Sequence, residues 1–240
     1  VKGRRPRPAP ARPHLVVLTP TRELAQQVTA ATTQFDKYLR RTICGSIVGG
    51  MPYPRQLEML AKMPDILVAT PGRLLDHMNS GRIDLSELSM LVFDEADRML
   101  DMGFEEDIHK IIKKTPPKRQ SLLFSATYPD AIQGMSQRVL QSPVVVSIES
   151  QDDYSQIQQH FIEAAYSDKA IAVTKVLAHY RPESTVIFCN TKVDCNDLTE
   201  FLNSKGFDVL TLHGDLEQRD REQVLLRFSN KSCPILIATD

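Results

Sequence analysis

Three carboxylates stand close together in the segment Leu91–Asp101, which has the sequence LVFDEADRMLD. An apolar run ends at Phe93, and Asp94, Glu95 and Asp97 follow it directly. An aspartate at the end of a buried strand suits Mg²⁺, which keeps several waters and takes one or two carboxylates together with substrate phosphates. A neighbouring glutamate can orient or deprotonate a water for attack on a γ-phosphate. The pattern therefore predicts phosphoryl-transfer chemistry, with Asp94 binding magnesium through water and Glu95 acting on the attacking water.

Simpler interpretations of this neighbourhood exist. Acidic residues also suit the N-terminus of a helix that begins near Arg98, although this explains one carboxylate well and three poorly. The segment LLFSATYPD places Ser125 and Thr127 at the end of another apolar run. Their hydroxyl groups can bond a neighbouring carboxylate and sense its movement, while a helix-capping role for Thr127 explains the residue equally well.

Two strand–helix junctions repeat one pattern. The segments LVVLTPTRELA and DILVATPGRLL each contain an apolar run, Thr-Pro, one residue, Arg and a helical stretch. Thr19 and Thr70 suit the N-cap position, and the prolines after them suit the first helical turn. Each junction places a helix N-terminus, which attracts phosphate, at the carboxyl end of a strand. Arg22 and Arg73 add a positive charge there.

Further polar junctions lie at the ends of other apolar runs. Gly49 and Gly50 follow one such run and let another backbone approach closely. For any single junction, ordinary turn chemistry is a sufficient explanation, and the two arginines have local carboxylate partners available in Glu23 and Asp76. Four polar junctions at the same kind of edge favour a track for a phosphate backbone. In the second half of the chain this track comprises Asn190, Thr191, Lys192, Gly214, Gln218 and Arg221.

Short apolar runs alternate along the chain with stretches of helical period. This alternation predicts an α/β fold with parallel sheets covered on both faces. The predicted strands are His14–Leu18, Ile43–Val48, Asp65–Ala69, Met90–Phe93, Ser121–Phe124, Val144–Ile148, Ile157–Ala165, Thr185–Cys189, Asp208–Leu212 and Pro234–Ala238. The predicted helices include Thr21–Leu39, Phe104–Lys113, Lys169–His179, Asp194–Ser204 and Gln218–Phe228.

The alternation is interrupted once, which predicts two domains. Residues 149–156 are polar and have no period, so we interpret them as a linker between a first domain at 14–148 and a second at 157–240. Residues 1–13 are basic and rich in proline, which indicates a solvated loop. A nucleic-acid-binding arm is the alternative for this segment.

The bulk composition excludes few classes of protein. The net charge of the 240-residue chain is −1, so overall charge does not indicate a nucleic-acid partner. No apolar run approaches the ~18 residues of a membrane helix. The chain has four cysteines and no CxxC pair, which favours reduced thiols and a cytoplasmic location.

Together these motifs resemble the DEAD-box ATP-dependent RNA helicases. PTRELA, GG, TPGR, DEAD, SAT, VIFCNTK, HGDLEQRDR and ATD occur in that family's order and at compatible spacing, and the resemblance covers the chain after residue 13. The segments GGMP, DHMNSG and CNTKVDCNDL are most similar to a bacterial branch that acts in ribosome assembly. The resemblance implies two RecA-like domains in tandem, an ATP and Mg²⁺ requirement, and RNA, with ribosomal RNA as a candidate. A monomer is favoured.

The resemblance also implies a role for each matching residue. Asp94 and Glu95 would serve Mg-ATP and hydrolysis. Asp97, Ser125, Thr127 and Asp240 would couple the nucleotide to RNA and to domain closure. The residues that would bind RNA are Arg22, Gly49, Gly50, Thr70, Gly72, Arg73, Asn190, Thr191, Lys192, Gly214, Gln218, Arg221 and Thr239.

Two motifs of the family are missing. The sequence contains no GxxxxGK[ST] phosphate loop and no His-Arg-Gly-Arg stretch. The resemblance therefore implies an internal piece of a helicase with both domains truncated, and we expect these 240 residues alone not to hydrolyse ATP. The alternatives are a DNA-directed ATPase of similar architecture and a non-enzymatic RNA-binding module.

Overall fold

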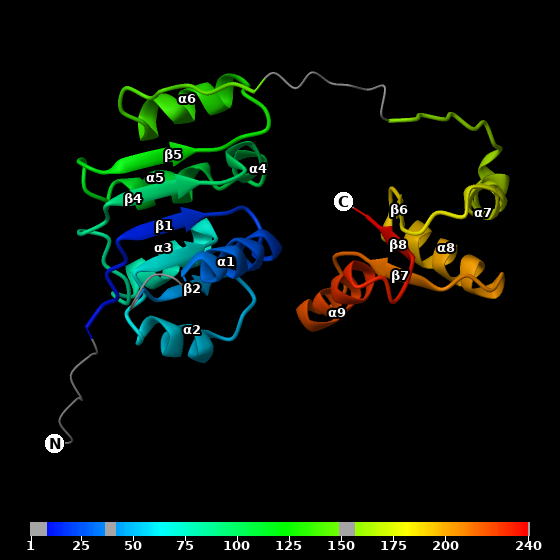
Figure 1. The fold of residues 1–240 in the computed structure, drawn as a ribbon, viewed down its shortest axis with the longest axis horizontal. Helices are drawn as coiled ribbons and strands as arrows, with labels where there is room; N and C mark the ends of the chain where they lie inside the picture. Colours follow the sequence, from blue (N-terminus) through cyan, green and yellow to red (C-terminus); the bar gives the residue numbers. More distant parts are fainter. Residues whose placement is uncertain (1–8, 37–41, 149–156, 240) are drawn as a thin grey trace. The chain divides into compact units, whose positions relative to one another are not determined.

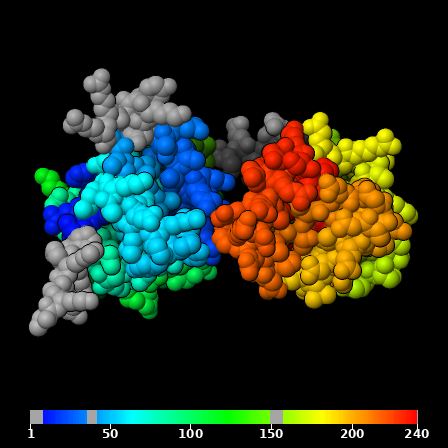
Figure 2. Space-filling view, turned by 90° about the horizontal axis from the view of Figure 1, so that it is seen from below, coloured from blue at the N-terminus to red at the C-terminus, as the bar shows by residue number. Residues whose placement is uncertain are grey.

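The computed structural model describes residues 9–36, 42–148 and 157–239. The chain divides into two compact units, the first ending at Ser147 and the second beginning at Ile148. Each unit contains one sheet with its own helices (Figure 1), and each is a continuous packed body in the space-filling view (Figure 2). The predicted linker 149–156 and most of the predicted N-terminal loop lie outside the described residues.

The first unit contains a five-stranded parallel sheet in the order β2-β3-β1-β4-β5. Its strands are rich in Val, Ile and Leu, as expected for strands that are covered on both faces. Their bounds are β1 Leu15–Leu18, β2 Cys44–Ile47, β3 Ile66–Ala69, β4 Met90–Phe93 and β5 Gln120–Leu123. Because all five are parallel, their carboxyl ends meet at one edge of the sheet.

Helices cover both faces of this sheet. They are α1 Arg22–Asp36, α2 Tyr53–Leu60, α3 Pro71–Asn79, α4 Ala96–Asp101, α5 Glu105–Ile112 and α6 Asp130–Val139. Successive strand residues point to opposite faces. Val16 and Leu18 join the larger core, to which α2 through α6 contribute, whereas Val17 packs with Ala25 of α1 in a smaller cluster.

The second unit contains a three-stranded parallel sheet in the order β6-β8-β7. Its elements are η2 Tyr166–Asp168, α7 Lys169–Tyr180, β6 Thr185–Phe188, α8 Lys192–Ser204, β7 Val209–Leu212, α9 Gln218–Ser229 and β8 Ile235–Ala238. Leu177 of α7 and Leu202 of α8 pack in one cluster, and Leu210 packs with residues of α9 in another.

Two of the predicted strands are wrong. The segments Val144–Ile148 and Ile157–Ala165 contain no strand, and their apolar side chains are open to solvent, with Val144 89% and Phe161 94% exposed. A strand forms only where a neighbour accepts its backbone hydrogen bonds, and neither segment pairs with a described strand.

Within the described part of the chain, no helix combines the length and apolar character that a membrane crossing requires.

Candidate functional site at the carboxyl edges of the two sheets

The predicted site residues of the first unit lie at the carboxyl edge of its sheet, in two groups that follow different strands. Strands β2, β3 and β1 are followed by the predicted RNA-binding residues, which are Gly49 and Gly50, then Thr70, Gly72 and Arg73, then Arg22. Strands β4 and β5 are followed by the predicted catalytic and coupling residues, which are Asp94, Glu95 and Asp97, then Ser125 and Thr127. The order of the strands (Figure 1) thus separates the predicted RNA-binding residues from the predicted catalytic and coupling residues.

The backbone turns sharply between β4 and α4. The N–H of Asp94 donates to the carbonyl of Leu18 over 2.9 Å and continues the pairing of β4 with β1. Glu95 then adopts a left-handed conformation with φ 52° and ψ 55° at the N-cap of α4. This conformation costs a residue with a side chain about 1 kcal/mol, and such strain is concentrated at functional sites. The Glu95 carboxylate makes no capping hydrogen bond and lies 3.8 Å from Nη1 of Arg98.

Asp97 joins the β4–α4 turn to the segment after β5. Its Oδ2 accepts hydrogen bonds from the N–H of Thr127 over 3.0 Å and from the Thr127 hydroxyl over 2.9 Å. Its Oδ1 accepts from the N–H of Arg98 over 3.0 Å. Partial burial raises the pKa of Asp97, but these hydrogen bonds outweigh burial and hold the pKa below its usual value. The Ser125 hydroxyl donates to the Thr127 carbonyl over 2.7 Å, so the structure brings three of the four coupling candidates together.

A magnesium ion fits the edge only together with phosphates. In the described ranges, no group of three or more His, Cys, Asp or Glu side chains is arranged to hold a metal. Asp94 and Glu95 are both partly exposed at the strand end. One or two carboxylates are what a magnesium ion takes from a protein when substrate phosphates supply the remaining oxygens.

The two Thr-Pro junctions differ, contrary to the predicted repeat. Helix α3 begins at Pro71 with Thr70 at its N-cap, as predicted. Helix α1 begins only at Arg22, and Thr21 caps it by accepting from the N–H of Leu24 over 3.3 Å. The prediction of Thr19 as a cap is wrong, since the helix begins three residues later and the Thr19 hydroxyl donates to the carbonyl of Thr21 over 3.2 Å.

The loop after β2 lies against both arginines. Gly50 has φ +72°, and a Cβ added there would collide with the guanidinium of Arg22. The N–H of Gly49 donates to the Thr70 hydroxyl over 3.3 Å. Nη1 of Arg73 lies 3.5 Å from the Met51 carbonyl, whereas its Nε lies 3.9 Å from Asp76, the predicted local alternative. Arg73 thus faces the loop more closely than it faces the carboxylate.

In the second unit the predicted residues also follow the strand ends. Thr191 caps α8, since its hydroxyl oxygen accepts from the N–H of Asp194 over 3.0 Å. Lys192 forms an ion pair with Asp215, a residue that sequence reasoning missed although it stands in the HGD motif. The remaining predicted residues here are Asn190 after β6, Gly214 after β7, Thr239 after β8, and Gln218 and Arg221 on α9. Asp240 lies outside the described residues.

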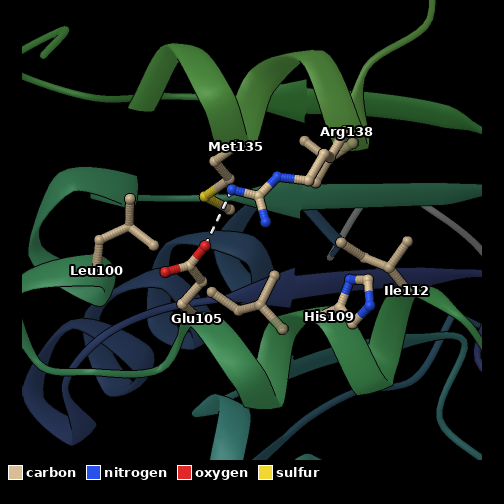
Figure 3. Close-up of a pocket in the computed structure, with 8 residues that line it drawn as sticks. Leu100, Glu105, His109, Ile112, Met135 and Arg138 are labelled. Carbon is tan, nitrogen blue, oxygen red and sulfur yellow. Dashed lines mark hydrogen bonds and ion pairs between the residues drawn. The ribbon is translucent and has the colours of Figure 1, made fainter. Parts of the chain in front are cut away.

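A small cavity between α5 and α6 is separate from these edges (Figure 3). Its volume is about 20 Å³, room for little more than one water. Arg138 of α6 and Glu105 of α5 form an ion pair of 3.0 Å beside it. None of the predicted site residues lines this cavity, so we interpret it as a packing gap.

Comparison with known proteins identifies both units. Residues 6–135 match the DEAD/DEAH box helicase family, and residues 168–240 match the helicase conserved C-terminal domain. The chain is 47% identical over 225 residues to the ATP-dependent RNA helicase DbpA of Escherichia coli, covering 94% of this chain and 49% of DbpA. It is 37% identical to the DEAD-box ATP-dependent RNA helicase RhpA of Helicobacter pylori, covering 94% and 46%. The chain therefore spans about half the length of the curated relatives it matches.

The solved structures include Saccharomyces cerevisiae Dbp5 bound to RNA and ADP BeF3. Dbp5 matches with a TM-score of 0.81 and 28% identity, over 98% of this chain and 60% of Dbp5. The predicted pair of RecA-like parallel-sheet units is confirmed by this likeness together with the two family matches.

Proposed function

The chain belongs to the DEAD/DEAH box helicase family, and on this premise we propose that the protein is an ATP-dependent RNA helicase. It hydrolyses ATP when RNA is bound and remodels or unwinds short RNA duplexes. The observation that carries this proposal is the divided carboxyl edge of the first sheet, where Gly50, Arg73 and Arg22 follow β2, β3 and β1, whereas Asp94 and Glu95 follow β4. The two groups suit a nucleic-acid backbone and a nucleotide respectively.

On the hydrolytic side, Asp94 and Glu95 act at the end of β4. Asp94 would hold Mg²⁺ through water, and the chemistry that such an ion would supply there is neutralisation of phosphate charge. Glu95 orients the attacking water and accepts its proton. The position of Asp94 and Glu95, side by side and partly exposed at the carboxyl end of β4, supports this assignment.

Between the two sides, Asp97 couples the nucleotide to movement. Its carboxylate, at the start of α4, accepts hydrogen bonds from the N–H and the hydroxyl of Thr127. The Ser125 hydroxyl donates a hydrogen bond to the Thr127 carbonyl. A movement of the β4–α4 turn is therefore transmitted to the segment between β5 and α6. Asp240, which follows Thr239 in the sequence, is assigned to the same coupling.

On the RNA side, the residues bind the phosphate backbone and do not read bases. Backbone N–H groups and arginines at the ends of β-strands position an RNA backbone without sequence preference. In the first unit this set is Arg22, Gly49, Gly50, Thr70, Gly72 and Arg73; in the second it is Asn190, Thr191, Lys192, Gly214, Gln218, Arg221 and Thr239.

The likeness to DbpA supports a finer proposal. We infer that the substrate is ribosomal RNA during ribosome assembly, and that the protein works as a monomer in the cytoplasm. The supporting observations are the 47% identity to DbpA and the motifs shared with the bacterial branch of the family.

The test uses the complete protein, meaning the product of the whole coding sequence in which these 240 residues occur. Release of phosphate from ATP is measured with single-stranded RNA and with DNA of the same sequence, which lacks the 2′-OH groups. We expect stimulation by RNA and little by DNA, together with ATP-dependent separation of a short RNA duplex. Equal stimulation by DNA would identify the DNA-directed ATPase, and RNA binding without hydrolysis would identify the binding module.

A further inference from the structure

One face of α3 is directed at the loop Val48–Met51, here called the Gly-Gly loop. Thr70, Arg73 and His77 lie at the N-cap and three and seven residues along, a spacing that places side chains on the same helix face. Thr70 accepts from the N–H of Gly49, and Arg73 lies 3.5 Å from the carbonyl of Met51. His77 acts on the same loop through an intermediate residue of α2.

That intermediate residue is Gln56, which is only 1% exposed. Its Nε2 donates to the carbonyl of Val48 over 3.2 Å and to the carbonyl of Met51 over 2.9 Å. These two carbonyls stand on either side of the glycine pair. Because both amide hydrogens are used, the opposite end of the amide, Oε1, is an acceptor that faces away from the loop.

His77 meets this acceptor. It is completely buried, and its Nε2 lies 3.4 Å from Oε1 of Gln56. Since Oε1 can only accept, Nε2 donates the hydrogen of this bond, which leaves Nδ1 on the other side of the ring. That Nδ1 is buried with no hydrogen-bond partner in the described part of the chain. Burial lowers the pKa of His77; Asp76 opposes this, and the charges of Arg73 and Arg82 act with burial.

Tyr53 connects the buried pair to the predicted RNA-binding arginine. Its ring stacks on His77 with a centroid distance of 4.6 Å and an interplanar angle of 23°. The guanidinium of Arg73 lies over the same ring, 5.6 Å from its centroid. His77 therefore supports both Arg73, through Tyr53, and the Gly-Gly loop, through Gln56.

We propose that His77 and Gln56 are positioning residues for RNA binding, which hold the Gly-Gly loop and Arg73 in the arrangement that receives a phosphate. The proposal rests on the proposed function of this edge. In the described part of the chain, the only side-chain hydrogen bond of His77 continues through one amide to the two carbonyls that flank the glycines.

The experiment measures RNA-stimulated ATP hydrolysis by the complete protein, with oligouridine as the probe. His77→Leu and Gln56→Met should raise the RNA concentration for half-maximal stimulation about tenfold, the scale of a buried polar group left without its partner. The rate at saturating RNA should stay near that of the unmodified protein, because neither residue lies at the hydrolytic side. His77→Gln, which keeps an N–H donor, should recover part of the affinity. His109→Leu, at an exposed position on α5, is the matched control and should change nothing.

Hydrogen–deuterium exchange of the unmodified chain and the variants supplies a readout independent of RNA. The amide of Gly49 should exchange faster in His77→Leu than in His109→Leu. An unchanged half-maximal RNA concentration, or equal losses of affinity and saturated rate in all three variants, would overturn the inference. Absence of RNA stimulation in the unmodified protein would instead count against the proposed function, and the exchange result would still decide whether His77 holds the loop.

Discussion

Gly50 is constrained twice, by its backbone and by its neighbour. Its φ of +72° lies in the left-handed region, and a Cβ there would collide with the guanidinium of Arg22. Gly81 has a similar φ of +70°, but nothing lies within 4 Å of an added Cβ. The two glycines therefore separate backbone strain from displacement of the arginine.

Replacing Gly50 by Ala should weaken RNA binding about tenfold, the scale of one lost hydrogen bond to a charged group. Gly81→Ala should cost about 1 kcal/mol of stability from the same backbone strain and leave RNA affinity unchanged. RNA affinity by fluorescence anisotropy and stability by denaturant titration would distinguish the two effects. Equal RNA affinities for both variants would show that Arg22 plays no part in binding.

Arg73 offers a second test at the scale of one residue. If it contacts a phosphate, Arg73→Ala releases one contact and flattens the slope of log K against log salt by ~0.7 for single-stranded RNA. Arg138→Ala, which removes an arginine paired with Glu105 away from the edge, should leave the slope unchanged. A changed melting temperature with an unchanged slope in Arg73→Ala would favour the local pair with Asp76.

At the scale of elements, the paired strands of the sheets were predictable, whereas the two segments between the sheets were wrongly predicted as strands. Met90–Phe93 has the predicted bounds, and the other paired strands differ by a residue at one or both ends, because a short apolar run between polar turns allows few alternatives. Val144–Ile148 has the same composition but no described partner. The composition of a segment indicates its tendency to form a strand, but whether it pairs depends on a partner strand that is distant in the sequence.

The same distinction applies to the candidate site. The carboxylates of the β4–α4 turn were predictable, because polar residues at the end of an apolar run are a local signal. The pair of Gln56 and His77 was not, since its members are separated by 21 residues and meet only when α2 and α3 pack on one face of the sheet. The available signal was a histidine inside the apolar stripe of α3, which core packing explains equally well.

The hydrogen bonds between the β4–α4 turn and the segment after β5 predict a variant in which ATP hydrolysis is uncoupled from RNA unwinding. Thr127→Val removes the hydroxyl that donates to Asp97 but keeps the backbone N–H. RNA duplex unwinding should fall about tenfold, the scale of one hydrogen bond to a carboxylate, while RNA-stimulated ATP hydrolysis changes less. Thr174→Val on α7, which removes a hydroxyl bonded to its own helix, serves as the control. Parallel losses of unwinding and hydrolysis would show that Thr127 serves the chemical step itself.

The α2–α3 contact predicts sensitivity to acid. The folded pKa of His77 is lowered, so the unfolded chain binds a proton more readily. The stabilising contribution of neutral His77 is complete above the unfolded pKa of about 6.5 and is lost as pH falls towards the folded value. The melting temperature should therefore drop between neutral pH and about pH 5.5, and the drop should be smaller in His77→Gln. An identical drop in His77→Gln would assign the acid sensitivity to other groups.

At the scale of the whole molecule, two similar units each have polar residues at their strand ends, and the proposed function assigns ATP hydrolysis to the first unit and RNA binding to both. Only the first carries the predicted catalytic pair Asp94 and Glu95, whereas both carry basic and glycine residues at their sheet edges. A phosphate backbone bound to both edges would be held by two bodies, and hydrolysis at the first would change how they hold it. Turnover of ATP would then depend on one side chain, Glu95, whose removal leaves binding of both ligands in place.

The most direct measurement is therefore the comparison of ATP affinity and RNA-stimulated turnover in Glu95→Gln of the complete protein. The amide is nearly isosteric but cannot accept the proton of the attacking water, so kcat should fall at least ~100-fold, the scale of one general base, while the affinity for ATP holds. Glu105→Gln, an exposed carboxylate on α5, should behave like the unmodified protein. Comparable losses of ATP binding and turnover in Glu95→Gln, or turnover that persists, would contradict the account.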